Sequence, residues 1–372
     1  MPFLKQGSNE SRYLMNTRLE RLRRFLPADD TAALIAAEHH IRYLTGFPSG
    51  DSFLLITREK AYFLTDFRYI EAAKQTVTGA ECVIISRLGK ALSEIAERHG
   101  LRRILLETAD TTLGFLKRMR EQTPKVEFEE SGELDRWLCE ARAVKDEAEV
   151  KKILQAQALT EEGFDYITQH IREGMTEREI ALELEFYIRK RGAERVAFDF
   201  IVVSGANTSL PHGIPTDKCV RRGDFITMDF GAVVDGYHSD MTRTVALGEV
   251  SEEKRFVYDT VLNAQRAALS VLTEGLLCTE GDAAARRVIE QAGYGANFGH
   301  ATGHGVGVQI HEEPRLSAAV GEQRLKAGHV VTVEPGIYLE GRFGVRIEDM
   351  VLIEKNGCRN LTKSPKELLL IN

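Results

Sequence analysis

Residues 225–230 read F-I-T-M-D-F, and an Asp-Gly pair at 235–236 separates them from a second stretch, Y-H-S-D-M-T-R-T-V at 237–245. Apolar residues alternate with polar ones in the first stretch, which indicates a β-strand with one buried face. Asp-Gly is a strong signal for a hairpin turn. The resulting hairpin predicts that Asp240 lies within a residue or two of the position facing Asp229.

Two aspartates held this close repel each other unless a cation lies between them. Asp229 and Asp240 are therefore candidate metal ligands. A pair of exposed strand aspartates is a common alternative, so the hairpin needs support from other segments of the chain.

A glycine-rich stretch supplies a histidine. Residues 299–307 read G-H-A-T-G-H-G-V-G, with His300 and His304 four positions apart. The glycines make a helix unfavourable and suit a backbone that closely approaches a ligand or ion. We expect His304 to bind metal and His300 to contact substrate, whereas the alternative for either residue is a hydrogen-bonded core histidine.

Two glutamates follow at the ends of apolar strands. Residues 330–338 read V-V-T-V-E-P-G-I-Y, which leaves Glu334 where a strand ends and a turn begins. A buried carboxylate there needs a metal or a proton. In G-V-R-I-E-D-M-V, alternation directs Arg346 and Glu348 to one face and Asp349 away from it. A strand ion pair is the alternative.

Four carboxylates and one imidazole suit a pair of divalent cations better than a single zinc ion, which three or four ligands saturate. Such a pair supports metal-assisted hydrolysis. His212 and His311 lie in loop-like segments beside proline or glycine. With the carboxylate strands between them, they indicate a polar, cation-binding cleft.

The bulk composition excludes several classes of protein. The chain has 372 residues, 43% hydrophobic and 28% charged, and a net charge of −7, which argues against general binding of nucleic acid or acidic membranes. The five cysteines are scattered, without a C-x-x-C pair, as expected for reduced thiols. Residues 1–15 contain no apolar run typical of a secretory signal, and no stretch is long enough to span a membrane. We expect a cytoplasmic protein.

The order of elements predicts two domains. Residues 1–142 alternate short apolar strands with amphipathic helices, as in a small α/β domain. Residues 143–372 have an α+β pattern of helix pairs followed by strands, including a capping box at Thr176 and Glu179. The basic residues of an N-terminal helix are expected to form its solvated face, namely Arg18, Arg21, Arg23 and Arg24.

The segments around the candidate ligands read, in order, M-D-F-G (228–231), S-D-M-T-R (239–243), G-H-A-T-G-H-G-V-G (299–307), V-E-P-G-I-Y (333–338) and R-I-E-D (346–349). This ordered set resembles the superfamily of methionine aminopeptidase, aminopeptidase P and prolidase, whose catalytic domain has the pita-bread fold. The first ~140 residues, with Y-L-T-G-F and T-D-F-R-Y, are similar to the N-terminal domain of creatinase and Xaa-Pro peptidases.

The resemblance implies a role for each residue. Asp229 binds one cation, Asp240 and Glu348 bridge both, and His304 and Glu334 complete the second site. Glu334 also accepts a proton from the water between the metals, which then becomes the bridging hydroxide. The remaining positions that match the family are the catalytic histidines His212 and His311 and the substrate-binding residues His300 and Arg346, the last two being typical of the Xaa-Pro branch.

We therefore expect a homodimeric two-metal peptidase that cleaves peptides with proline in second position, with manganese favoured over cobalt or zinc. Whether it acts as a dipeptidase or an aminopeptidase stays open. A creatinase-like amidinohydrolase and a non-catalytic pita-bread module that binds peptide or protein are the alternatives.

Overall fold

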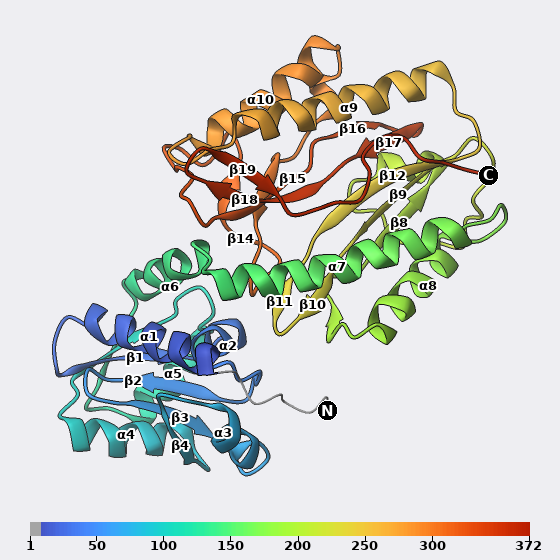
Figure 1. Ribbon diagram of the computed structural model, residues 1–372. Coiled ribbons are helices and arrows are strands. Elements are labelled where there is room, and N and C mark those ends of the chain that lie inside the picture. The colour runs from blue at the N-terminus through green and yellow to red at the C-terminus, as the bar shows by residue number, and fades with distance from the viewer. Residues whose placement is uncertain (1–8) are drawn as a thin grey trace. The chain divides into compact units, whose positions relative to one another are not determined.

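The computed structural model describes residues 9–372 of the chain, with side chains from residue 15 onward (Figure 1). Residues 1–8, part of the segment in which we expected no secretory signal, lie outside the described residues. The chain divides into two compact units, Met1–Arg142 and Ala143–Asn372. Within the described residues, no helix has the length and apolar character needed to cross a membrane.

A six-stranded mixed sheet, in the order β4-β3-β2-β1-β5-β6, forms the centre of the N-terminal unit. Its strands are β1 (Thr31–Ile35), β2 (Phe53–Ile56), β3 (Ala61–Thr65), β4 (Glu81–Ile84), β5 (Arg103–Leu106) and β6 (Glu127–Glu129). β1 pairs in parallel with β5 and antiparallel with β2. Every residue of β1 and β3 is buried, because both faces of the sheet are covered by helices.

The helices of this unit are α1 (Asn9–Phe25), α2 (Glu38–Thr45), α3 (Ile70–Thr76), α4 (Leu88–His99), α5 (Leu113–Gln122) and α6 (Glu133–Ala143). α4 and α5 pack on one face of the sheet through Leu92, Ile95 and Leu116. Figure 1 shows α1 and α2 on the other face. The α/β pattern predicted from the sequence is therefore the observed one.

The prediction that the basic residues of α1 are solvated is wrong for Arg18. Its side chain is only 9% exposed. Nη1 donates a hydrogen bond of 2.9 Å to the Tyr43 carbonyl oxygen, and Cζ lies 4.1 Å from the centre of the Tyr43 ring. A guanidinium that is hydrogen-bonded and stacked on an aromatic face tolerates burial.

The C-terminal unit contains four sheets. The strands in the four-stranded sheet, in the order β20-β12-β9-β8, are β20 (Leu370–Ile371), β12 (Met241–Leu247), β9 (Phe225–Phe230) and β8 (Ile201–Ser204). The five-stranded sheet is built from β14 (Glu312–Leu316), β13 (Gly303–Gly305), β15 (Val330–Val333), β18 (Asp349–Glu354) and β19 (Gly357–Asn360). The smaller sheets comprise β7 (Arg195–Val196), β10 (Ala232–Val234) and β11 (Tyr237–His238), and separately β16 (Gly336–Leu339) and β17 (Phe343–Arg346).

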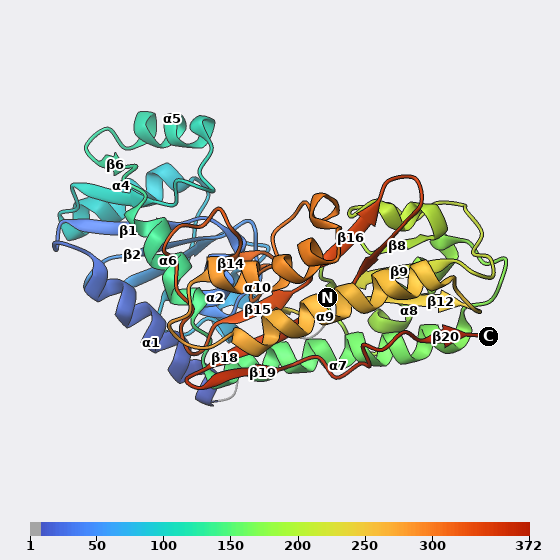
Figure 2. The ribbon, with the colours of Figure 1, turned by 90° about the horizontal axis from the view of Figure 1, so that it is seen from above.

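Two helix pairs cover these sheets. They are α7 (Glu147–His170) with α8 (Glu177–Lys190), and α9 (Glu252–Val271) with α10 (Cys278–Gln291). Phe164 and Ile180 of the first pair pack against Met228 of β9. Val261 of α9 packs with Val331 of β15. In Figures 1 and 2, α9 and α10 lie over one side of the strands and α7 and α8 lie on the other, which is the α+β pita-bread arrangement.

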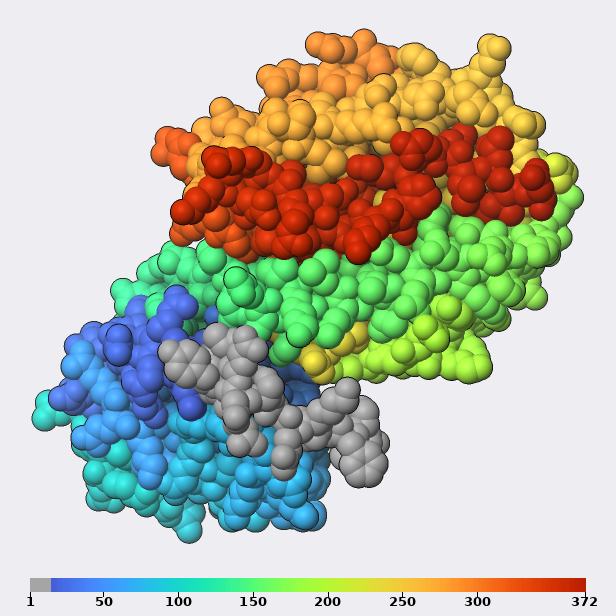
Figure 3. Space-filling model, viewed as in Figure 1, coloured from blue at the N-terminus to red at the C-terminus, as the bar shows by residue number. Residues whose placement is uncertain are grey.

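Local signals in the sequence account for much of this unit. Asp235 and Gly236 both have positive φ, 47° and 82°, and join β10 to β11 in the predicted tight turn. The capping box of Thr176 and Glu179 is present at the start of α8. The C-terminal residues run along the surface between α7 and α9 on the face shown in Figure 3.

A side chain from within the helix stabilises the start of α10 at Cys278. Glu280 accepts a hydrogen bond from the Leu277 backbone N–H at 3.0 Å, which gives a partner to one of the backbone donors at the helix start.

Candidate metal centre and active site

The aspartate hairpin forms as the sequence predicted. β9 and β12 pair antiparallel, with Asp229 opposite Thr242 and Phe230 opposite Met241. Asp240 immediately precedes β12, which places it two residues from the position facing Asp229. The two aspartate side chains line the same cavity.

The glycine-rich stretch forms strand β13, which lies between β14 and β15. A Cβ atom on Gly303 would lie 1.9 Å from the Thr332 carbonyl oxygen, and one on Gly305 would lie 2.4 Å from the Glu313 carbonyl oxygen. Both positions therefore need glycine. His304 stands between them, with Nδ1 3.0 Å from the Gly305 carbonyl oxygen.

The other imidazole nitrogen of His304 faces carboxylates. Nε2 lies 3.5 Å from Asp240 Oδ2 and 3.4 Å from Glu334 Oε1. Because Nδ1–H donates a hydrogen bond to the Gly305 carbonyl oxygen, Nε2 has the lone pair that a metal needs. Among the described residues, Asp240, His304 and Glu348 offer ligand atoms that all lie within 4.8 Å of one another.

Threonines hold the two glutamates. Glu334 directly follows β15, and its Oε1 accepts a hydrogen bond of 3.1 Å from Thr332 Oγ1. Glu348 lies between β17 and β18, where its Oε2 accepts a hydrogen bond of 2.6 Å from Thr242 Oγ1. Thr242 belongs to β12, so Glu348 is linked directly to the aspartate hairpin.

All nine site residues predicted from the sequence line one cavity of about 590 Å³. They come from segments spread over more than 130 positions of the chain and from both larger sheets. They are His212, Asp229, Asp240, His300, His304, His311, Glu334, Arg346 and Glu348. No predicted site residue lies elsewhere.

The electrostatics of this cavity favour a cation. Burial, followed by the charge of Glu348, raises the pKa of Asp240 well above its usual value. Burial also raises the pKa of Glu348 and brings that of Glu334 to about 8. A divalent cation would remove this mutual repulsion and keep the acids ionised.

Two further observations show that the residues fit metal. Burial lowers the pKa of the His304 imidazole to about 3, so the ring is neutral, as a ligand must be. Asp229 Oδ1 is buried and has no hydrogen-bond partner in the described part of the chain. A buried acceptor of this kind is costly unless a ligand satisfies it.

Arg346 connects Asp229 to Tyr338 and, through Tyr338, to His300. Its Nη2 donates to Asp229 Oδ2 at 2.7 Å, and its Nη1 donates to the Tyr338 hydroxyl at 2.9 Å. That hydroxyl lies 3.0 Å from His300 Nε2. Burial lowers the pKa of His300 to about 4, so His300 is a neutral hydrogen-bonding group.

The two remaining histidines border the same cavity. The His311 ring lies 4.3 Å from the His304 ring, centre to centre, and burial followed by Arg315 lowers the pKa of His311. His212 is exposed and lies in the segment that follows β8. Its neighbour Pro211 accepts a hydrogen bond of 3.1 Å from Arg346 Nη1.

Sequence reasoning missed three residues of the site. Tyr338 was quoted in the V-E-P-G-I-Y segment without a role, although it bridges His300 and Arg346. Thr242 and Thr332 were also overlooked. Strand alternation was a usable signal for both threonines, since each lies two residues from a ligand on the same face of its strand.

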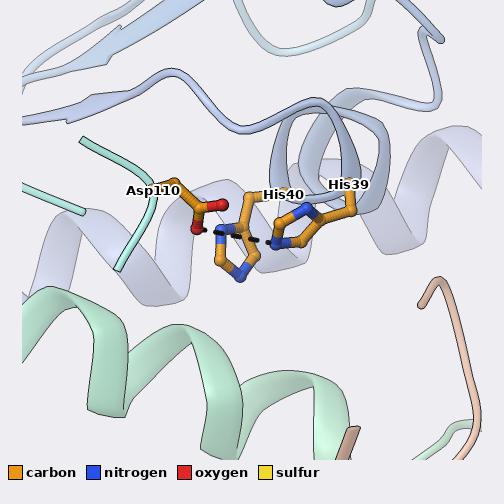
Figure 4. A group of neighbouring side chains, drawn as sticks. All are labelled: His39, His40 and Asp110. Atoms are coloured by element: carbon orange, nitrogen blue, oxygen red, sulfur yellow. Dashed lines mark ion pairs between the residues drawn. The ribbon is translucent and has the colours of Figure 1, made fainter. Parts of the chain in front are cut away.

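A second group of histidine and aspartate side chains lies in the N-terminal unit (Figure 4). His39 Nε2 is 3.9 Å from Asp110 Oδ2, which is long for an ion pair. His40 Nδ1 already contacts the fully buried Glu107, at 2.5 Å. Glu107 also accepts from the Ala37 backbone N–H at 3.0 Å, so it anchors the start of α2, and we assign no metal to this group.

Comparison with known proteins identifies the family. Residues 151–355, which include every candidate site residue, match the model of metallopeptidase family M24. The chain belongs to this family. Members of the M24 family are metallopeptidases that use divalent metal ions, and residues 18–144 match the creatinase/prolidase N-terminal domain.

The similarity of this M24 peptidase to known proteins extends over both of its domains. The Xaa-Pro dipeptidase of Pyrococcus horikoshii is 34% identical, over 96% of this chain and 99% of its own length. The structure of an Xaa-Pro dipeptidase from Bacillus anthracis is 37% identical, with a TM-score of 0.90 over 96% of this chain and 99% of that one. An X-Pro aminopeptidase from Thermotoga maritima is 39% identical, with a TM-score of 0.88 over 94% and 100%. The M24 assignment and these relatives therefore favour a metallopeptidase over the non-catalytic module and the amidinohydrolase.

Proposed function

We propose that this M24 peptidase hydrolyses the bond between the first residue of a peptide and a proline in second position. The observation that carries the proposal is the convergence of all nine predicted site residues on one cavity. The names of the similar dipeptidases and aminopeptidase support the choice of substrate. All nine residues lie within 143–372, so we assign catalysis to this domain and leave residues 1–142 a supporting role.

We assign two divalent cations to the five metal-binding residues. Asp229 would bind one cation, Asp240 and Glu348 would bridge both, and His304 and Glu334 would complete the second site. When bound, the cations would supply a bridging hydroxide as the nucleophile and would polarise the scissile carbonyl. An oxygen-rich set with a single imidazole favours manganese, with cobalt and zinc as alternatives.

The protein groups supply proton transfer and orientation. Glu334, which the bound cations would keep ionised, would be the acceptor for the proton of the attacking water. His212 and His311 border the cavity as hydrogen-bond donors to the scissile carbonyl and the tetrahedral intermediate. Arg346 and His300 would bind the substrate. The contacts that join Asp229 to Arg346, Arg346 to Tyr338 and Tyr338 to His300 support this role.

This chemistry suits a peptide bond that precedes proline. That bond is a tertiary amide without an N–H group, and its proline ring restricts the backbone. Peptidases that hold an extended substrate through this N–H bind it poorly. A cavity that binds the free amine among carboxylates and cations, and receives the ring separately, needs no such N–H.

Metal reconstitution tests the proposal. The metal-stripped protein should be inactive and should regain cleavage of Ala-Pro or Ala-Pro-Ala with manganese, while Met-Ala-Ser is cut poorly. Asp240→Ala should abolish the activity and reduce the bound metal measured by elemental analysis. Asp259→Ala, on an exposed site of α9, is the matched control and should change neither.

The outcome also separates the two substrate classes. A preference for Ala-Pro identifies a dipeptidase and a preference for Ala-Pro-Ala an aminopeptidase, whereas a preference for Met-Ala-Ser contradicts the proposal. We further propose a homodimer, which light scattering of the full chain tests.

A further inference from the structure

The segment that carries His212 has little backbone structure of its own. It leaves β8 at Ser204, passes through a short 3₁₀ helix, η1 (Gly205–Ser209), and reaches Thr216. Its internal backbone hydrogen bonds are turn contacts such as Leu210 N–H to the Asn207 carbonyl oxygen at 3.0 Å. A catalytic histidine on such a segment needs an anchor from elsewhere in the fold.

A single buried carboxylate holds both ends of this segment. Glu177, the first residue of α8, has no exposed surface. Its Oε1 accepts hydrogen bonds from the Ser204 backbone N–H at 2.7 Å and from Ser204 Oγ at 2.9 Å. Its Oε2 accepts from the Thr216 backbone N–H at 3.0 Å and from Thr216 Oγ1 at 2.6 Å.

The same carboxylate also contacts the 3₁₀ helix inside the segment. Asn207 Nδ2 donates to Glu177 Oε1 at 3.0 Å and to Oε2 at 3.2 Å. These donors compensate for the burial of a charged group. The Lys218 ammonium, which donates to Ser204 Oγ at 2.7 Å, adds a positive charge next to the cluster.

Glu177 is not needed to cap α8. Thr176 and Glu179 form a complete capping box at the start of that helix, so the orphan backbone donors there have other partners. The Glu177 side chain instead forms hydrogen bonds with the segment that carries His212. Elsewhere in the segment, Arg346 holds Pro211 and the Gly344 backbone N–H donates to Thr208 Oγ1 at 2.8 Å, so Glu177 is the anchor that both ends share.

We propose that Glu177 is a positioning residue for His212, although Glu177 does not itself line the cavity. The inference rests on the proposed catalytic role of His212. Backbone hydrogen bonds such as Arg178 N–H to the Thr216 carbonyl oxygen at 3.1 Å do not depend on this carboxylate. Loss of the carboxylate therefore loosens the segment without detaching it and shifts the imidazole away from the reacting carbonyl.

Glu177→Gln is a sharp probe, because each carboxylate oxygen faces a backbone N–H group. In either orientation, the amide NH₂ of glutamine meets one of those donors and frees one end of the segment. We expect faster hydrogen exchange in residues 205–216 and a fall in kcat and kcat/KM of up to about 100-fold, the size of effect that a 1 Å misplacement causes. Bound metal should stay unchanged.

Glu179→Gln is the matched control, since it removes a carboxylate from the same helical turn without touching the segment. It should lower the melting temperature but leave kcat and the exchange of residues 205–216 unchanged. An equal loss of kcat in both variants, or normal exchange in Glu177→Gln, would overturn the inference.

A double-mutant cycle with His212→Ala completes the test. If Glu177 acts through His212, Glu177→Gln should cause no further loss of kcat in the His212→Ala background. If the decreases in kcat of the two single variants instead multiply in the double variant, the inference is overturned. If His212→Ala by itself leaves kcat unchanged, the proposed role of His212 fails and this inference with it; if His212→Ala is impaired while Glu177→Gln is not, only the role of Glu177 fails.

Discussion

Glu348 and Asp349 are consecutive in sequence and both fully buried, yet their surroundings are opposite. Glu348 accepts a hydrogen bond from Thr242 and faces other acids, and burial and the charge of Glu334 raise its pKa. Two positively charged side chains compensate for the burial of Asp349. It lies 2.8 Å from Arg243 Nη2 and 2.8 Å from Lys366 Nζ, which hold its pKa below the usual value.

The contrast shows how one extended segment supplies both a proposed ligand and a structural support. Side chains alternate along extended chain, so Glu348, just before β18, and Asp349, its first residue, point to opposite faces. The face with Asp349 is completed by protein donors, including Gln265 and Asn360. On the other face, Glu348 meets the charges of Glu334 and Asp229, which the proposed cations would offset. We therefore interpret a buried acid among other acids as a candidate ligand, and one among donors as a structural support.

The largest effect on activity is expected from Glu348→Gln. Loss of this proposed metal ligand should reduce peptidase activity by more than about 100-fold, which is the upper range for losing a residue that only supports a ligand. The metal-free protein should be at least as stable as the parent, because one repelling charge is removed. Steady-state kinetics, elemental analysis and thermal unfolding check this, and unchanged metal content would contradict it.

Asp349→Asn should have the opposite effects, namely lower stability and unchanged metal binding. Arg243, whose side chain is 1% exposed, would lose its carboxylate partner, and breaking such a buried pair costs about 3–5 kcal/mol. Urea unfolding of the metal-free protein measures this loss. The folded fraction should still bind its full complement of metal, and a selective loss of metal at unchanged stability would reverse the roles assigned to the two acids.

The pH dependence of the metal-free protein should sharpen the contrast. Burial raises the pKa of Glu334 from its usual 4.5 to about 8, so between these values the folded state retains a proton that the unfolded chain has released. Stability must therefore fall as pH rises through this range. Added manganese should raise the melting temperature more at pH 8 than at pH 6; an equal rise at both would count against the interpretation.

The smallest effect is expected from Tyr338→Phe. This change removes the hydroxyl that joins His300 to Arg346 and leaves a buried hydrogen-bonding group without its partner, at a cost of about 1–3 kcal/mol. A decrease in kcat/KM of roughly 10-fold with normal metal content is expected, since about 1.4 kcal/mol corresponds to a factor of ten. Lost metal would instead make Tyr338 part of the metal centre.

Short-range signals explain what the sequence predicted well. The Asp235-Gly236 turn and the capping box of Thr176 and Glu179 depend on the backbone preferences of neighbouring residues, and both form as expected. Alternation along the strands predicted that Arg346 and Glu348 share a face and that Asp349 lies on the other. The residue types and their order indicated the metallopeptidase family.

Short-range signals could not predict the contacts between segments that are distant in the sequence. Nothing near Arg18 indicated that Tyr43 would bury it, and nothing near Glu177 indicated that it would hold Ser204 and Thr216. By itself, the sequence determined the candidate ligands and the strands that bear them, because propensity, turn chemistry and periodicity act over a few residues. Only the tertiary structure decided which buried acids meet cations and which meet one another, because partners far apart in the chain set the charge around each group.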